Sequence, residues 1–372
     1  LKMPFIKKVY KKFNTRENRR FSVPRNFKKI SPENSYSSFI LGADVGGTNT
    51  KLGVFGVKNN LPELLLSFRF KTKELKALRY AVNEALECVK TTYKISIAKA
   101  CIAAAGILSP KKDYVKTQNL PWNISKKELL KKTKLSKILV VNDFEAIGYG
   151  INMLKKKDVA VIKKAERIPK APIVVAGAGT GLGKTTLIYN EHYKSYIPLP
   201  SEAGHTDFAA QSKEELDLVN FIKKHKKIKQ SISYEEILSG RGLSNIYLFL
   251  RKSHKFKETK YIKEIGKSKN NPELISKYRK IDKTCNKAFR IFKIIYARFA
   301  RNMAIDSIAR GGVYIAGGIA PKNKEVFDRE FVKAFEDNYK LAYLLKKIPV
   351  YLITNYDAGL LGAGFSGAKF LK

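Results

Sequence analysis

Phe39-Ile-Leu-Gly-Ala-Asp-Val-Gly-Gly-Thr-Asn-Thr-Lys-Leu-Gly-Val-Phe-Gly-Val57 is the stretch that decides the fold. Its first six residues predict a buried strand that ends at Asp44, and Gly46-Gly47 then predicts a turn. The residues from Thr50 to Val57 alternate and predict the second strand of a hairpin. An acidic side chain at a strand end, with glycines and Thr48 beside it, is typical of a loop whose backbone N–H groups approach a phosphate.

Strands and helices alternate along the rest of the chain, which predicts an α/β fold. The apolar pattern predicts further strands at 99–107, 138–141, 173–176, 185–189, 192–199, 313–316 and 350–353, and helices at 73–93, 213–225, 284–309 and 359–367. Between two of these helices, residues 251–283 are rich in Lys and predict an exposed, charged helical excursion.

Three more glycine clusters lie beside predicted strands, at 177–183, 317–318 and 359–364. One such cluster has many local explanations, but four of them together favour a nucleotide site. The segment Ala178–Thr185 nearly matches a Walker A loop, which requires a following helix whose N-terminus faces the phosphates. Because two strands are predicted to follow instead, we do not expect a P-loop.

The composition indicates a two-domain globular protein. The chain has 372 residues and 44% hydrophobic residues, which excludes a disordered protein. No apolar run approaches the ~20 residues of a membrane span, so no membrane partner is expected. Three widely spaced cysteines, Cys88, Cys101 and Cys285, cannot form a paired disulfide framework. We therefore expect reduced thiols and a cytoplasmic location.

The net charge first suggests a nucleic-acid partner, because 73 Lys and Arg stand against 32 Asp and Glu, for a formal charge of +41. Removing the first 30 residues, which carry eleven Lys or Arg and one Glu, lowers that charge by ten, to +31. The excess is therefore spread over the folded part, and much of it lies away from the motifs. We interpret it as a surface property and do not expect nucleic-acid binding.

Seven motifs in order give the chain a resemblance to bacterial-type glucokinases. They are Asp44-Val-Gly-Gly-Thr-Asn49, Val141-Asn-Asp143-Phe, Gly177-Ala-Gly-Thr-Gly-Leu-Gly183, Pro200-Ser-Glu202-Ala-Gly-His205, Leu238-Ser-Gly240, Ile315-Ala-Gly-Gly318-Ile, and Pro349-Val-Tyr-Leu352 followed by Gly359-Leu-Leu-Gly362. The similarity runs from about Phe39 to the C-terminus. It implies an α/β actin-like, hexokinase-like fold, with two ribonuclease-H-like lobes and a cleft between a small and a large domain.

The resemblance also implies domain limits and an activity. Residues 1–38 would form a flexible basic tail, residues 39–145 with 355–372 the small domain, and residues 146–354 the large domain. The implied reaction is ATP-dependent phosphorylation of glucose at the 6-hydroxyl, giving glucose 6-phosphate and ADP. A homodimer is implied by the resemblance alone.

The resemblance assigns a role to each motif residue. Asp143 matches the catalytic base, and Asp44 matches a Mg²⁺ site reached through water. The implied sugar ligands are Asn119, Asn142, Asp143, Glu202, His205 and Glu235. The implied nucleotide site comprises Asp44, Gly46, Gly47, Thr48, Asn49, Gly179, Thr180, Gly181, Gly317 and Gly318. Glu235 is chosen over Glu236 by its spacing from Gly240, and Glu236 is expected to be solvated.

The physical chemistry of the reaction suits these residue types. A hexose presents hydroxyls that each donate and accept, so a selective site needs carboxylates and amides that pair with them. Phosphoryl transfer requires positioning, neutralisation of phosphate charge and one carboxylate near the attacking hydroxyl.

Other interpretations stay open at this point. Asp143 is also well placed to cap the helix that begins at Phe144. Ser201 and Ala203 stand where the family usually has glycine, which leaves the hexose open between glucose, mannose and N-acetylated hexoses. A sugar-sensing DNA-binding regulator of the same fold is the remaining alternative. No Cys-x-Cys-Gly loop follows His205, so structural zinc is not expected.

Overall fold

The computed structural model describes residues 36–117, 120–253, 259–268 and 271–371, together with three two-residue strands before residue 36. Most of the predicted tail, residues 1–38, lies outside these ranges. The chain folds as two compact units. Unit 1 comprises residues 1–154, 190–198 and 357–372, and unit 2 comprises residues 155–189 and 199–356. Compared with the boundaries expected from sequence, residues 146–154 and 190–198 group with unit 1.

The first sheet belongs to unit 1 and has the strand order β11-β7-β4-β5-β6-β3. Its strands are β3 (Phe21–Ser22), β4 (Ser38–Val45), β5 (Asn49–Lys58), β6 (Leu61–Lys71), β7 (Lys99–Ala104) and β11 (Lys137–Asn142). β4, β5 and β6 are antiparallel neighbours, whereas β7 and β11 run parallel to β4. The predicted hairpin of β4 and β5 is confirmed. Two smaller sheets contain β1 (Asn14–Thr15) with β2 (Asn18–Arg19), and β8 (Ile107–Leu108), β9 (Tyr114–Lys116) and β10 (Ile124–Ser125).

The helices of unit 1 are α2 (Leu78–Tyr93), α3 (Lys126–Lys132), α4 (Asp143–Gly150) and α12 (Ala358–Phe370). The predicted start of α2 at residue 73 is wrong. Residues 72–74 form a short 3₁₀ turn, η1, because the backbone N–H and hydroxyl of Thr72 donate to Thr48 and Gly46 rather than entering the helix.

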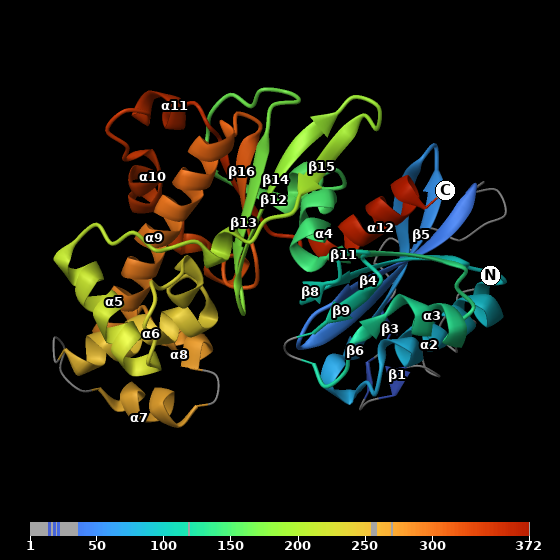
Figure 1. The fold of residues 1–372 in the computed structure, drawn as a ribbon, viewed down its shortest axis with the longest axis horizontal. Coiled ribbons are helices and arrows are strands. Elements are labelled where there is room, and N and C mark those ends of the chain that lie inside the picture. Colours follow the sequence, from blue (N-terminus) through green and yellow to red (C-terminus); the bar gives the residue numbers. More distant parts are fainter. Residues whose placement is uncertain are drawn as a thin grey trace. The chain divides into compact units, whose positions relative to one another are not determined.

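Helix α12, drawn in red in Figure 1, packs directly on α4 and β4. A Cβ atom on Gly362 would lie 1.7 Å from the Ala146 carbonyl oxygen, and one on Gly364 would lie 2.4 Å from the Phe55 ring. The glycines at 359–364 therefore allow close helix packing. They lie in a helix rather than in a fourth glycine turn, and their role toward a nucleotide stays a prediction.

The second sheet has the order β12-β17-β16-β13-β14-β15. Its strands are β12 (Val159–Lys163), β13 (Ile173–Ala178), β14 (Leu182–Asn190), β15 (Ser195–Leu199), β16 (Gly312–Ala316) and β17 (Val350–Ile353). β13 pairs antiparallel with β14 and parallel with β16, which in turn pairs parallel with β17. The path β15-β14-β13-β16-β17 repeats the path β6-β5-β4-β7-β11 of the first sheet, so the two predicted ribonuclease-H-like sheets are present.

The remaining helices and 3₁₀ turns belong to unit 2. They are η2 (Lys156–Asp158), η3 (Ala203–His205), α5 (Lys213–Lys226), η4 (Tyr234–Glu236), α6 (Gly240–Lys252), α7 (Lys260–Lys267), α8 (Asn271–Tyr278), α9 (Lys283–Ser307), η5 (Pro321–Val326), α10 (Arg329–Glu336) and α11 (Ala342–Lys346). Helix α9 is the centre of the unit 2 core, and fifteen of its residues are buried.

The Lys-rich segment 251–283 is helical in its described parts, as predicted, but its expected exposure is wrong in part. Ile265 and Ile275 are almost fully buried in the same core as α9, and Tyr278 is buried with them. Lys side chains cover the outer face of these short helices, which hides the apolar spacing in the sequence. None of the described helices is both long and apolar enough to span a membrane.

Candidate active site

In unit 1, the predicted residues gather at the carboxyl ends of three parallel strands. In the register of the sheet, Asp44 on β4 and Val141 on β11 both pair with Ala103 of β7, and Asn142 pairs with Ala104. β4 and β11 are two strand spacings apart, or roughly 10 Å. The side chains that follow these strand ends therefore share one edge of the sheet.

Asn142, rather than Asp143, caps helix α4. The Asn142 Oδ1 atom accepts from the backbone N–H of Phe144 at 2.8 Å and of Glu145 at 3.4 Å, and the Glu145 side chain accepts from the Asn142 N–H. Asp143 Oδ1 accepts from the adjacent Phe144 N–H at 3.0 Å. The helix is therefore capped without Asp143, and the alternative that Asp143 serves as the cap is wrong.

Asp44 lies in an environment that disfavours its charge. Its pKa is raised to about 6, mainly by burial, while the Lys51 ammonium lowers it and the carboxylates of Asp143 and Asp357 raise it. Lys51 Nζ lies 2.8 Å from Asp357 Oδ1. A Cβ atom on Gly359 would lie 3.3 Å from Asp44 Oδ2, so the first turn of α12 contacts this carboxylate. Two further carboxylates and one ammonium thus influence the charge of Asp44.

The glycine turn between β4 and β5 is held by a residue that the motif does not include. Gly46 N–H donates to Asn49 O at 3.0 Å, and the Thr72 hydroxyl donates to Gly46 O at 2.7 Å. Thr72 also contacts the Thr50 hydroxyl at 3.0 Å, and Thr72 is fully buried. The only signal in the sequence is a threonine directly after an apolar strand, which is too common to single out.

In unit 2, two glycine clusters that are far apart in sequence lie side by side. Gly179 N–H donates to Gly181 O at 2.8 Å and closes the turn between β13 and β14. Gly317, at the end of β16, has φ of +86°, and a Cβ atom there would lie 2.3 Å from the Ala178 carbonyl oxygen. Only glycine fits this position without strain.

Tyr296 on α9 contacts the ends of both β13 and β16, the latter at Ala316 O at 3.4 Å, and the sequence does not single it out. Its hydroxyl accepts from Ala178 N–H at 3.1 Å and donates to Ala176 O at 3.1 Å. The Tyr296 side chain is fully buried, and burial raises the pKa of its hydroxyl well above the usual value. In the sequence, Tyr296 is one of several aromatic and aliphatic residues on the same helix face, and only its hydroxyl distinguishes it from its neighbours.

Two further motifs contact the same turn at Leu182. Leu182 N–H donates to Glu235 Oε2 at 2.9 Å. A Cβ atom on Gly204 would lie 2.0 Å from Leu182 O, so η3 packs against the turn. His205 Nε2 lies 3.8 Å from Glu202 Oε2 on η3, and both of these side chains are exposed. Of the predicted residues, Glu235 thus contacts the glycine turn directly, and Gly204, between Glu202 and His205, packs against it.

Sequence-based expectations also concern three further residues: Lys184, Glu236 and Asn119. Lys184 of the near-match to Walker A lies on β14 with Nζ 3.8 Å from Asp306, and a strand follows the turn, so a P-loop is absent here. Glu236 is not solvated as expected, because it pairs with Lys226 and lies beside Asn245. Asn119 lies outside the described residues.

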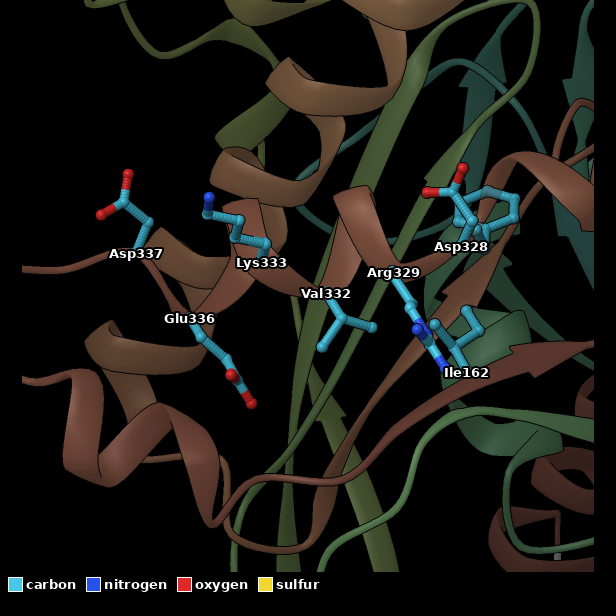
Figure 2. A pocket seen from close by; sticks show the side chains of 8 residues that line it. Ile162, Asp328, Arg329, Val332, Lys333, Glu336 and Asp337 are labelled. Carbon is cyan, nitrogen blue, oxygen red and sulfur yellow. The ribbon is translucent and has the colours of Figure 1, made fainter.

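A cavity of about 620 Å³ in unit 2 does not contain any predicted site residue. It is lined by Ile162, Phe327, Asp328, Arg329, Val332, Lys333, Glu336 and Asp337. In Figure 2 the Arg329 guanidinium lies beside Ile162, whereas the ends of Lys333 and Glu336 point in opposite directions. The charged groups do not converge on one point, so this cavity lacks the arrangement of a catalytic site.

Comparison with known proteins identifies relatives over nearly the whole folded chain. Residues 41–369 match the glucokinase family. The glucokinase of Photorhabdus laumondii is 36% identical over 329 residues, which cover 87% of this chain and 95% of that protein. The crystal structure of a glucokinase from an Antarctic psychrotroph superposes with a TM-score of 0.73 at 25% identity, covering 89% of this chain and 98% of that one. A Streptomyces griseus glucokinase of the ROK family, solved in complex with glucose and AMPPNP, shares the fold with a TM-score of 0.60 at 18% identity, covering 88% and 98% of the two chains.

Proposed function

The chain belongs to the glucokinase family, and from this premise we propose that it transfers the terminal phosphoryl group of ATP to the 6-hydroxyl of glucose. The observation that best supports the proposal is the capping of α4 by Asn142. The N-cap role therefore does not fall to Asp143, whose carboxylate lies directly after the end of β11 and accepts from the Phe144 N–H. The related enzymes are named for glucose, and AMPPNP in one structure is an ATP analogue.

We propose Asp143 as the general base. Its carboxylate accepts the proton of the 6-hydroxyl as the bond from that oxygen to the γ-phosphorus forms and the bond to ADP breaks. A positioned carboxylate in this role typically contributes ~10²–10⁴-fold to the rate. The neighbouring Asn142 uses its Oδ1 atom as a cap, so its Nδ2 amide group is the donor that we assign to a sugar hydroxyl.

In unit 2, we assign the remaining sugar contacts to Glu202, His205 and Glu235. Two carboxylates and an imidazole supply the acceptors and donors that a ring of hydroxyls requires. Glu202 and His205 are exposed and separated by 3.8 Å, which leaves their polar atoms accessible to a ligand. Asn119 remains a sequence-based assignment.

We assign the nucleotide phosphates to the turns at 46–49, 179–181 and 317–318, whose glycines let backbone N–H groups approach an anion. Asp44 is the residue that would hold Mg²⁺ through water. The described residues include no cluster of three or more metal-ligating side chains. This fits Mg²⁺ in a kinase, which is usually held by one or two carboxylates together with the substrate phosphates. When bound, the ion neutralises phosphate charge.

The base assignment is tested with the variant Asp143→Asn, which keeps the size and the hydrogen bond to Phe144. We expect the turnover number to fall by at least ~10²-fold while KM for glucose and thermal stability change little. Glu87→Gln, on the exposed side of α2, is the control for a lost carboxylate in unit 1. Turnover of Asp143→Asn close to that of the wild type would show that another group takes the proton.

The choice of sugar is tested with a panel of hexoses and coupled detection of ADP. We expect glucose to give the highest kcat/KM, whereas a higher value for mannose or N-acetylglucosamine would reassign the substrate within the same chemistry.

All three cysteines are reduced and buried, which supports a reducing compartment, and we propose the cytoplasm. The homodimer implied by the resemblance stays a prediction.

A further inference from the structure

Glu235 is held at both of its carboxylate oxygens. Oε2 accepts from Leu182 N–H at 2.9 Å, and Oε1 accepts from Arg241 Nη2 at 3.0 Å. The Glu235 side chain is 14% exposed, whereas Arg241 is 65% exposed on the first turn of α6. A Cβ atom on Gly181 would lie 2.5 Å from Oε2, so the carboxylate also contacts the glycine turn directly.

The start of α6 contacts the same turn at a second point. Gly240 N–H donates to Gly179 O at 2.8 Å. The helix start is itself fixed, because the Ser239 side chain accepts from Gly242 N–H and donates to Glu235 O. The turn from Gly179 to Leu182 is therefore held at its two ends by one short segment of chain, which carries both Glu235 and Arg241.

We propose that Arg241 is a positioning residue that, through Glu235, couples the binding of the sugar to the binding of the nucleotide. This inference rests on the proposed function, which assigns Glu235 to the sugar and the turn at 179–181 to the nucleotide. The carboxylate that contacts the sugar is then the same group that orders the backbone facing the phosphates. A ligand that fixes Glu235 reduces the cost of ordering the turn for the other ligand.

The hydrogen-bonding capacity of the carboxylate allows this double role. Two oxygens offer about four lone-pair directions, and the structure uses one on each oxygen. The planar guanidinium of Arg241 fixes the plane of the carboxylate, which keeps Oε2 on Leu182 N–H and leaves further lone pairs for a hydroxyl. Without Arg241 only the Leu182 N–H holds the carboxylate, so its plane is less fixed and sugar binding orders the turn less.

The test measures the affinity of glucose and of AMPPNP with Mg²⁺ by calorimetry, each alone and each with the other ligand saturating. For the wild type we expect each ligand to tighten the other by the same factor, on the order of fivefold. In Arg241→Met, which keeps the side-chain stem, we expect this factor to fall close to one. Arg241→Lys, which keeps the charge but not the fork, is expected to restore part of it.

The control variant is Lys252→Met, at the opposite end of α6, which should keep the full coupling factor. The coupling factor separates a positioning role from a structural one, because simple damage to the fold weakens each ligand alone and leaves the ratio unchanged. High salt provides a second signature. Because the guanidinium is exposed, 1 M NaCl should lower the wild-type factor toward that of Arg241→Met.

Two results would overturn the inference while leaving the proposed function intact. They are binding of both ligands by the wild type without any coupling, and an unchanged coupling factor in Arg241→Met. If the wild type binds neither glucose nor AMPPNP, the proposed function itself is wrong and the inference falls with it.

Discussion

Replacing Asp44 with Asn should stabilise the protein at alkaline pH while abolishing phosphoryl transfer. The Asp44 carboxyl group has an ordinary pKa of 3.8 and a folded-state pKa of about 6, mainly because of burial. An acid with a raised pKa binds more protons in the folded state than in the unfolded state. The favourable contribution is therefore complete below pH 3.8 and is lost as the pH rises through about 6.

The two pKa values give the size of the effect. Full ionisation costs the folded state at most about 3 kcal/mol, and about 1.4 kcal/mol of this develops between pH 5 and pH 8. The amide that replaces the carboxyl group in the variant cannot ionise. The free energy of unfolding of Asp44→Asn, relative to wild type, should therefore rise by about 1.4 kcal/mol over that interval.

The assay is urea denaturation at pH 5 and pH 8 in the presence of EDTA, followed by tryptophan fluorescence. Trp122 is the only tryptophan in the sequence, lies buried in the unit that contains Asp44, and donates to Leu75 O at 2.7 Å. The signal therefore reports the correct unit. Asp357→Asn is the matched variant, because it removes one charge that raises the pKa of Asp44 and releases Lys51, so its pH dependence should be shallower than that of wild type.

A stability difference between Asp44→Asn and wild type that is equal at pH 5 and pH 8 would refute this reasoning. A difference that decreases toward pH 8 would refute it more strongly, since the carboxylate would then be stabilised in the folded state.

Three further predictions concern the free energy of unfolding in urea. Lys163→Met should lower this free energy by about 3 kcal/mol. The buried Lys163 ammonium donates to three carbonyl oxygens in and after α11, and it pairs with the Glu336 carboxylate at 3.2 Å. A loss below about 1 kcal/mol would contradict this structural role. Gly362→Ala should lower the free energy of unfolding by about 2 kcal/mol or more, because the added Cβ has no room. Gly266→Ala, where the added Cβ has nothing within 4 Å, should instead raise it by about 0.5–1 kcal/mol. Equal effects of the two substitutions would argue against the close packing of α12 on α4. Tyr296→Phe should cost about 1–3 kcal/mol, because it leaves the buried Ala178 N–H unpaired, and should raise KM for ATP; an unchanged KM would separate this hydroxyl from the nucleotide turn.

The sequence predicts the central strands of both sheets, because they are apolar runs and several of them end beside glycine, so these local signals agree with the tertiary structure. It does not predict β6, β12, α6, α10 or α11. The start of α2 is mispredicted because Thr72 binds the turn at 46–48, a contact across more than twenty residues. The burial of Ile265 and Ile275 is hidden by surrounding lysines. In both cases the deciding information lies in a partner that is distant in sequence.

The candidate site shows the same division. Its polar residues stand within recognisable motifs, whereas Thr72, Tyr296 and Arg241 act only through hydrogen bonds to those motifs. None of the three has a local pattern that distinguishes it from an ordinary surface or core residue. The glycines at 359–364 are the reverse case, because they form a recognisable motif that the sequence groups with the glycine turns of a nucleotide site, and they lie in a packed helix. Helix packing and phosphate binding both favour glycine, so the motif alone does not distinguish them.

The position of α12 in the chain has a consequence for synthesis on the ribosome. The sheet of unit 1 is translated early but needs α12, whose Gly364 would contact Phe55 and whose Gly367 would contact Ile40 through any added Cβ atom. All of unit 2 is translated between these two parts. The last strand of the unit 2 core, β17, is translated only a few residues before α12. Both cores therefore stay incomplete until this part of the chain emerges, and the apolar face of β4 and β5 stays open to chaperones until α12 is made.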